Sequence, residues 1–169
     1  MPLTLDYPSE TLYESIEKIS LTYPNYTALV FIGKKTKYKN FVSKIQQCAK
    51  ALKVLNIKPS DNVTLIMPNC PQALIMFYAV NCVGAVANMV HPLSSEYEIQ
   101  NFLNMSKSKF ALTLDLFASK FDEIINKTCI EKLIVASISE EMSSFKKIAY
   151  KASVRNKHSV ISSSSKILN

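Results

Sequence analysis

Short apolar runs alternate with segments of helical periodicity over most of this chain, and that alternation limits the fold more than any other feature. Runs typical of buried strands lie at 63–67, 85–90, 110–114 and 132–136. Between them, apolar residues recur at the three- to four-residue spacing of a helix. Strands that alternate with helices favour a parallel sheet with helices on both of its faces. We therefore predict an α/β fold.

The first sixty residues predict two helices separated by a small hairpin. Thr11 and Glu14 have the spacing of a capping box, which places a helix start at residue 12. A strand at 28–32 is followed by a turn and a return strand at 36–38, as in a hairpin. An amphipathic helix follows to about Leu55. Its apolar face consists of Phe41, Ile45, Cys48, Leu52 and Leu55.

The later helices are predicted from apolar spacing and from one further capping box. The segment 73–80 is apolar on all sides and predicts a buried helix. Ser95 and Glu98 form the second capping box. The apolar residues assigned to the remaining helices are Ile99, Phe102 and Leu103, then Phe117, Phe121, Ile124 and Ile125, then Met142, Phe145 and Ile148.

The uncharged stretch 73–90 has the length at which a transmembrane helix is considered. Asn81 and Asn88 interrupt it, Gly84 breaks its helical pattern, and no basic cluster flanks it. We predict a buried helix followed by a buried strand, and no transmembrane segment.

Positive charge is concentrated at the end of the chain. The formal net charge is +7, and residues 146–169 hold basic but no acidic residues. Nucleic-acid binding is not predicted, because only Phe145 and Tyr150 could stack on bases there. We predict an α/β subdomain over residues 1–150 and a basic, Ser-rich polar tail over 151–169.

The four cysteines do not predict a zinc site, and they are compatible with a reducing compartment. No two of the four have the spacing of a metal-binding pair, and the two histidines do not accompany them. The start of the chain lacks the pattern of a signal peptide. We predict a cytoplasmic location. The cysteines are Cys48, Cys70, Cys82 and Cys129.

Glycine is scarce, which excludes the usual nucleotide loops. Gly33 and Gly84 are the only two, so the chain has neither a GxGxxG nor a GxxxxGK[ST] motif. Such loops need several glycines close together so that backbone N–H groups approach the phosphate.

Several short motifs nevertheless resemble those of a nucleotide-using family. TKYKNF at 36–41 resembles T-Y-x-E-L, and LNIKPSDNV at 55–63 resembles L-G-V-x-x-G-D-x-V. AVNCVGAV at 79–86 resembles A-x-x-x-A-G-A-V, and HPLS at 91–94 resembles N-P-x-x. In this order, over residues 10–136, they resemble the amino-terminal part of the adenylate-forming superfamily, and most of all its AMP-forming acyl-CoA synthetases.

Three positions depart from the family pattern. Asn56 and Ser60 replace two glycines, and Gln72 replaces a glutamate. Asn56 is expected to keep the left-handed conformation that ends a helix.

The resemblance implies a parent enzyme that joins a fatty acid to CoA at the expense of ATP, with Mg²⁺, through an acyl-adenylate. The family's phosphate loop, ribose-binding Asp and late catalytic Lys do not occur in these residues. The chain is therefore predicted to be an inactive fragment, with the remainder of the parent synthetase as its partner. The alternative is a stand-alone, non-enzymatic α/β interaction module.

Five residues are candidates for a functional site. His91, at the end of a strand, could line an acyl or CoA channel, but a structural role beside Pro92 is favoured. Asp61 is interpreted as a turn cap rather than a general base. Asn69 is expected to cap a helix, and Gly84 to permit a helix end and close packing. With His158 as the only other histidine, no Ser-His-Asp triad is predicted. No catalytic, cofactor-binding or metal-binding residue is assigned.

Overall fold

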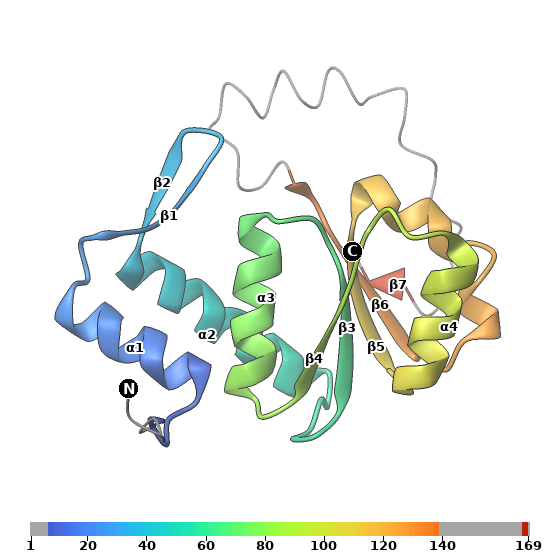
Figure 1. Cartoon of the computed structure of the whole chain (residues 1–169), viewed down its shortest axis with the longest axis horizontal. Coiled ribbons are helices and arrows are strands. Elements are labelled where there is room, and N and C mark those ends of the chain that lie inside the picture. Colours follow the sequence, from blue (N-terminus) through green and yellow to red (C-terminus); the bar gives the residue numbers. More distant parts are fainter. Residues whose placement is uncertain (1–6, 139–166, 169) are drawn as a thin grey trace, which may run out of the picture.

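The computed structural model describes residues 7–138 and 167–168, which form a parallel sheet flanked by helices and a separate hairpin (Figure 1). In chain order the elements are α1 (Leu12–Thr22), β1 (Thr27–Phe31), β2 (Lys34–Lys37), α2 (Tyr38–Val54), β3 (Asn62–Ile66), α3 (Pro71–Cys82), β4 (Val86–Val90), α4 (Glu96–Ser106), β5 (Phe110–Leu114), the 3-10 helices η1 (Asp115–Phe121) and η2 (Ile125–Lys127), β6 (Lys132–Ala136) and β7 (Ile167–Leu168).

The central sheet has the strand order β4-β3-β5-β6-β7, and every neighbouring pair is parallel. The predicted parallel sheet is confirmed. From β3 the chain first moves outward to β4 and then returns past β3 to β5. The direction of winding thus reverses between β3 and β5, which is where open α/β sheets form a crevice.

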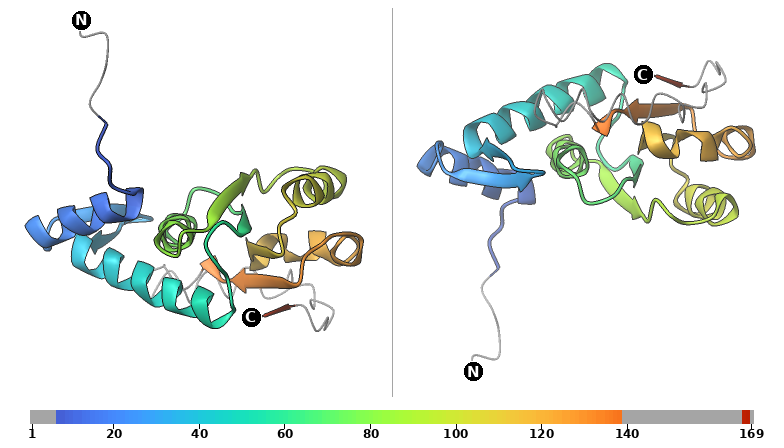
Figure 2. Two further views of the ribbon diagram at one scale, coloured as in Figure 1. Left: turned by 90° about the horizontal axis from the view of Figure 1, so that it is seen from below. Right: turned by 90° about the horizontal axis from the view of Figure 1, so that it is seen from above.

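Helices cover both faces of this sheet, as predicted. Val63, Leu65 and Leu112 pack on the face that carries α2 and α3. Ile66 and Ala111 belong to a second cluster with Leu103 of α4 and Phe121 of η1. Successive side chains of a strand point to opposite faces of the sheet, so a single strand contributes residues to both hydrophobic clusters. Figure 2 shows α2 and α3 on one side of the strands and α4 on the other.

The strand β4 lies at the edge of the sheet, which corrects the expectation of a buried strand. Val86 is 49% exposed and Met89 is 52% exposed, and only Val90 is buried. The absence of charge in this strand is typical of a strand at the centre of a parallel sheet. The sequence does not show the order of the strands, and so it did not indicate that β4 lies at the edge.

Two helices are also less buried than expected. In α3, Leu74 is 46% exposed, whereas Ala79 and Val80 are fully buried, so the helix has an open side despite its apolar composition. In α4, Phe102 is 42% exposed, while Ile99 and Leu103 lie in the core.

The connection from β5 to β6 is not the α-helix expected there but the two 3-10 helices η1 and η2. Their residues Phe121, Ile124 and Ile125 are buried as predicted, and Phe117 is half-buried. The last predicted helix, at 142–148, lies outside the described residues. The strand β7 pairs with β6 although the sequence showed no strand beyond residue 150.

The hairpin turn consists of Ile32 and Gly33, one residue earlier than expected. Phe31 and Lys34 are cross-strand partners, which leaves a two-residue loop with φ of 49° and 81°. Positive φ at both positions is the type I′ turn that fits the twist of a hairpin.

The uncharged stretch 73–90 is divided between α3 and β4. Within the described part of the chain, no helix combines the length and apolar character needed to cross a bilayer.

Candidate functional site

A cavity of about 480 Å³ opens at the carboxyl ends of the parallel strands. The loops that follow β3, β4 and β5 form its walls, at the side of the sheet where parallel α/β folds bind ligands. It is lined by Met67, Pro68, Asn69, Met89, Val90, His91, Pro92, Leu93 and Phe117.

His91 lies on the wall of this cavity with its side chain committed to a turn. Its Nδ1 accepts a hydrogen bond from the backbone N–H of Leu93 at 3.3 Å. The side chain is exposed. This contact supports the structural role favoured from the sequence.

A lysine from η1 holds the same loop in place. Lys120 Nζ donates to the carbonyl oxygens of Pro92 and Ser94, at 3.0 and 2.6 Å. Nothing in the local sequence indicates this role for Lys120, because the loop that it holds lies some 26 residues earlier in the chain. The Lys120 ammonium group therefore binds backbone carbonyl oxygens of this loop and has a structural role.

The helix α4 begins where this loop ends, in the predicted capping box. Ser95 Oγ accepts from the N–H of Glu98, and the Glu98 carboxylate accepts from the N–H of Ser95 at 2.8 Å. Hydrogen bonds from the Ser95 backbone and hydroxyl lower the pKa of Glu98. The box fixes the direction in which the chain leaves the cavity.

A cluster of hydrogen-bonded side chains that was not predicted from the sequence joins the ends of β5 and β6. Ser137 Oγ donates to Asp115 Oδ2 at 2.7 Å, and Gln72 Nε2 donates to the Ser137 carbonyl oxygen at 2.9 Å. Gln72 is only 7% exposed, and its Oε1 is buried without a hydrogen-bond partner. The available signal was that Asp115 and Ser137 each directly follow an apolar strand.

Asp61 and Gly84 lie at the opposite, amino end of the strands. Asp61 Oδ2 accepts from the N–H of Lys58 at 2.8 Å, which confirms the turn cap. Gly84 has φ of 75°, and a Cβ there would lie 3.3 Å from Pro59 Cβ. Its predicted role in a helix end with close packing is confirmed.

Asn69 does not cap α3 as predicted. The N-cap position is Cys70, which makes no side-chain cap hydrogen bond, and the Asn69 side chain is exposed at the rim of the cavity. His158 lies outside the described residues.

The lining of the cavity does not fit ATP with Mg²⁺. It offers no cationic or carboxylate side chain, and one imidazole that already accepts a hydrogen bond. Among residues 7–138 and 167–168, no three His, Cys, Asp or Glu side chains are grouped as metal ligands. The cavity supplies an apolar wall and the loop at 91–94, which Lys120 holds in place.

Comparison with known proteins identifies the family of this chain. A family model described as AMP-binding enzyme matches residues 16–166, most of the chain. The chain belongs to the AMP-binding enzyme family. The resemblance noted from short motifs is thereby confirmed, and the match extends beyond them into the basic tail.

Curated members of the AMP-binding family show the same relationship. A long-chain-fatty-acid–CoA ligase of Bacillus subtilis is 26% identical over 157 residues, which is 93% of this chain and 28% of the ligase. An acetyl-coenzyme A synthetase of Candida glabrata is 30% identical over 112 residues, 62% of this chain and 16% of the synthetase. The chain thus spans about a quarter of the length of the first of these relatives.

Solved structures agree on the fold. A long-chain-fatty-acid–CoA ligase from Archaeoglobus fulgidus superposes with a TM-score of 0.75 over 82% of this chain and 30% of its own, at 19% identity. Coronafacic acid ligase from Pectobacterium brasiliense gives 0.74 over 95% of this chain and 28% of its own, at 23% identity. The predicted subdomain of the adenylate-forming synthetase fold is confirmed.

Proposed function

We propose that this chain is the amino-terminal scaffold of an AMP-forming fatty acyl-CoA ligase and that these residues do not form acyl-adenylate alone. The observation that carries the proposal is the family match over 16–166 together with a cavity, at the ligand-binding edge of the sheet, that lacks phosphate-binding groups. The matched fatty acyl-CoA ligases favour a fatty acid as the carboxylate substrate.

In the complete enzyme, the fatty acid carboxylate attacks the α-phosphorus of ATP and releases pyrophosphate. The CoA thiol then displaces AMP to give the thioester. In this reaction the role of the described residues is to shape one wall of the site. Lys120 and the Ser95–Glu98 capping box hold the loop at 91–94 in one conformation, and preorganised walls of this kind exclude water from a reacting centre.

ATP and Mg²⁺ would have to be held by residues other than those that line the cavity, because the lining has no charge to offer the phosphates. A phosphate clamp needs backbone N–H groups of a glycine-rich loop, cationic side chains or a metal. We propose that the parent enzyme works in the reducing cytoplasm, where the four cysteines would stay reduced; none of them forms a disulfide in the structure.

The first test is pyrophosphate–ATP exchange with this chain alone and a panel of fatty acids. We expect no exchange above a no-protein control. Calorimetry with ATP and Mg²⁺ should give binding weaker than about 1 mM, or roughly −4 kcal/mol. Exchange or tighter binding would show a complete nucleotide site and contradict the scaffold role.

The second test is a chimera in which this chain replaces the matched segment of the Bacillus subtilis ligase. We expect acyl-CoA formation above that of the ligase lacking the segment. A folded chimera without activity would favour the stand-alone interaction module instead.

A further inference from the structure

Lysines without acidic neighbours in the sequence mark the outer side of β2 and α2. Residues 18–60 contain nine lysines, no arginine and no acidic residue. Five of these lysines are exposed in β2, at the N-cap of α2 and within α2, and we call them the lysine face. They are Lys35, Lys37, Lys39, Lys50 and Lys53.

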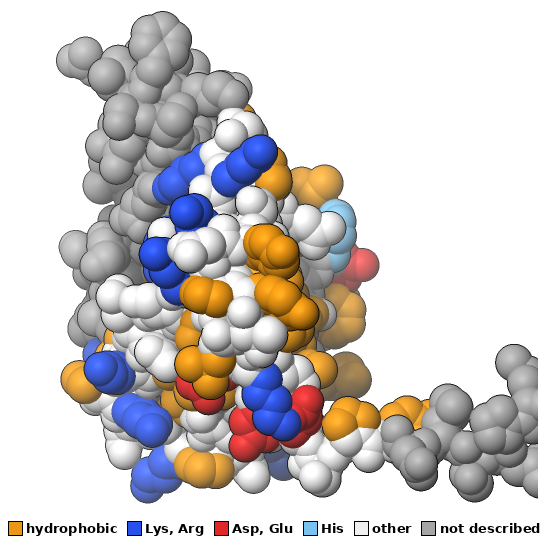
Figure 3. All heavy atoms as spheres, turned by 90° about the vertical axis from the view of Figure 1, so that its left-hand side faces the viewer, with side chains coloured by type: hydrophobic (Ala, Val, Ile, Leu, Met, Phe, Trp, Pro, Cys, Tyr) orange, Lys and Arg blue, Asp and Glu red, His pale blue; other side chains and the backbone are white. Residues whose placement is uncertain are grey.

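The members of the lysine face point outward from their elements. Lys39, Lys50 and Lys53 are separated by about three helical turns and about one turn, so they share one side of α2. In β2 the residue between Lys35 and Lys37 is buried, so these two side chains point away from the core. Figure 2 shows α2 along a border of the molecule. Figure 3 shows basic side chains along the left-hand flank, while the larger group of acidic side chains lies at the lower centre.

Little negative charge counters the lysine face. No ion pair among the described residues includes one of its five lysines. One carboxylate reaches α2: Glu17 accepts hydrogen bonds from Gln46 Nε2 at 3.2 Å and from Tyr13 Oη at 2.6 Å. The five lysines outweigh this carboxylate, so the face is strongly positive.

The lysines are not placed to stabilise α2, with the exception of Lys53 in its last turn. Lys37 is the N-cap and makes no side-chain cap hydrogen bond, and Lys39 lies in the first turn. The positive end of the helix dipole disfavours a cation there. A helix face that only contacts water usually carries both signs of charge, because opposite charges three or four residues apart stabilise a helix. This arrangement therefore indicates an anionic partner.

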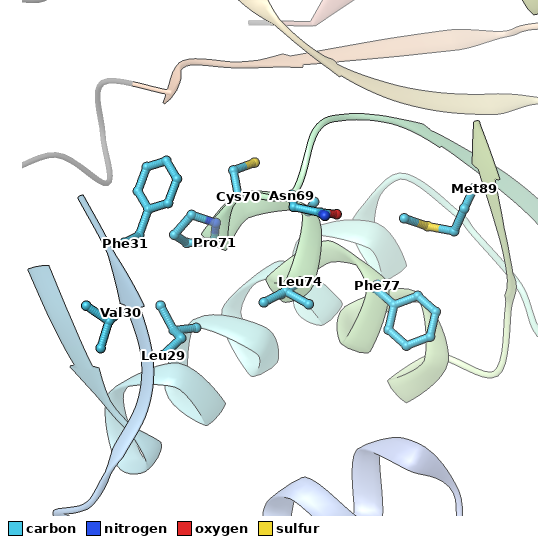
Figure 4. A pocket seen from close by; sticks show the side chains of 10 residues that line it. Leu29, Val30, Phe31, Asn69, Cys70, Pro71, Leu74, Phe77 and Met89 are labelled. Atoms are coloured by element: carbon cyan, nitrogen blue, oxygen red, sulfur yellow. The ribbon is translucent and has the colours of Figure 1, made fainter. Parts of the chain in front are cut away.

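The lysine face is separate from the apolar side of the same region. A hollow between β1 and α3 is lined by apolar side chains such as Leu29, Phe31, Leu74 and Phe77, and by no charged one (Figure 4). None of the five lysines lines this hollow or the cavity at the carboxyl ends of the strands. The lysine face is thus a surface distinct from the candidate site.

An anionic bilayer fits the lysine face better than a protein or a nucleic acid does. Lysine is depleted at protein–protein interfaces, and arginine, which binds phosphate in a fixed geometry, is absent from this segment. Val54 directly follows Lys53 and is 86% exposed. The headgroup region of a bilayer can cover such an apolar side chain, whereas a nucleic-acid backbone would leave it in water. Clusters of about four to eight lysines are typical of binding to anionic lipid headgroups.

We propose that the lysine face docks on a membrane surface that contains anionic phospholipids. The ammonium groups are attracted to the negatively charged headgroups over about 10 Å at an ionic strength near 0.1 M, so no segment has to insert into the bilayer. The inference goes beyond the proposed function and does not depend on the ligase reaction.

The experiment measures co-sedimentation of the full chain with vesicles of two parts phosphatidylcholine to one part phosphatidylglycerol. One variant combines Lys39→Gln, Lys50→Gln and Lys53→Gln. The matched control combines Lys107→Gln, Lys109→Gln and Lys127→Gln, which removes the same charge at exposed positions outside the lysine face. We expect the chain and the control to bind, and the α2 variant to bind at least about tenfold more weakly. Arginine at the same three α2 positions keeps the charge and should retain binding.

Several outcomes overturn the proposal. They are no binding to these vesicles, equal binding to vesicles of phosphatidylcholine alone, and binding that persists at about 0.5 M NaCl, where the charges are screened. Equal loss in both Gln variants would assign the binding to net charge rather than to the lysine face. Preference for a DNA duplex over the vesicles, lost only in the α2 variant, would make a nucleic acid the partner. None of these results bears on the proposed function, because acyl-CoA formation is not the readout.

Discussion

Several residues other than glycine adopt a left-handed backbone conformation, with positive φ, in this chain. Asn56 and Ser60 stand where the family pattern has glycine, and both keep positive φ, at 64° and 70°. The sequence predicted this for Asn56, since Asn tolerates that conformation. It did not predict it for Ser60, because a serine gives no such signal.

Ile32 is the most unfavourable of these positions, because a β-branched residue at positive φ is strained. We expect Ile32→Asn to stabilise the protein by about 1 kcal/mol, since Asn-Gly is the preferred pair in a type I′ turn. Chemical denaturation measures the change in the free energy of unfolding.

The control for this turn is Ile32→Val, which keeps the branched side chain and should leave the free energy of unfolding nearly unchanged or slightly lower. Equal stabilisation by both substitutions would show that the gain comes from removing exposed apolar surface rather than from backbone strain.

The candidate site illustrates what a sequence can and cannot show about single residues. His91 and Asp61 were placed in turns correctly, because each stands beside a turn-forming residue. Asn69 was misplaced by one position, and Asp115 with Ser137 was missed. Their meeting depends on the register of β5 against β6, which is not encoded locally.

At the scale of elements, α1 is anchored by one tyrosine. Tyr13 Oη donates to Glu17 Oε1 at 2.6 Å and accepts from Gln46 Nε2 of α2 at 3.1 Å, while its N–H donates to Asn81 of α3. Burial and the Glu17 carboxylate raise the pKa of Tyr13 to about 12.

A raised phenol pKa predicts a specific dependence of stability on pH. The folded state holds the Tyr13 proton more tightly than the unfolded state, so its contribution is complete below pH 10 and is lost as the pH rises toward about 12. Tyr13→Phe should remove that part of the slope. Urea denaturation of both proteins across this window measures it, and parallel curves would contradict the assignment.

The strand β3 is the most sensitive element of the core. Ile66 is fully buried, and Ile66→Ala should cost roughly 2–5 kcal/mol. Phe77, for which the sequence predicts equal sensitivity, is only half-buried, so Phe77→Ala should cost about half as much. Chemical denaturation measures both changes in the free energy of unfolding, and a loss at Phe77 as large as that at Ile66 would contradict its half-buried position.

Strands were easier to predict than the segments that join them. The strands β3, β5 and β6 are uncharged at their centres, and the sequence located each within one residue. β3 and β5 are buried almost throughout, whereas β6 is buried only at Leu133. The apolar spacing at 117–125 fits an α-helix equally well, but the structure has the 3-10 helices η1 and η2 there. At the start of η1, Asp115 accepts hydrogen bonds from the Leu116 N–H and from the Ser137 hydroxyl of a distant segment, which the local spacing does not indicate.

At the scale of the whole molecule, the sheet order determines which apolar strands are exposed. The sequence specified strands and their direction, but not that β4 would be outermost. Edge strands in stable monomers usually carry a lysine, a proline or a bulge, and β4 has none of these between Val86 and Val90. The predicted division into residues 1–150 and 151–169 stays a prediction.

Within the described part of the chain no strand pairs with the outer edge of β4, so the isolated chain should associate with increasing concentration through edge-to-edge pairing of β4. Val86 is half exposed on that strand. Val86→Lys places a charge where a second strand would pair, and should raise the concentration needed for association by about tenfold. Light scattering measures this as a lower average mass at a given concentration, approaching 19.0 kDa. Phe102→Lys adds the same charge to α4, away from the edge, and should leave association unchanged. If both variants reduce it equally, net charge rather than the edge governs association.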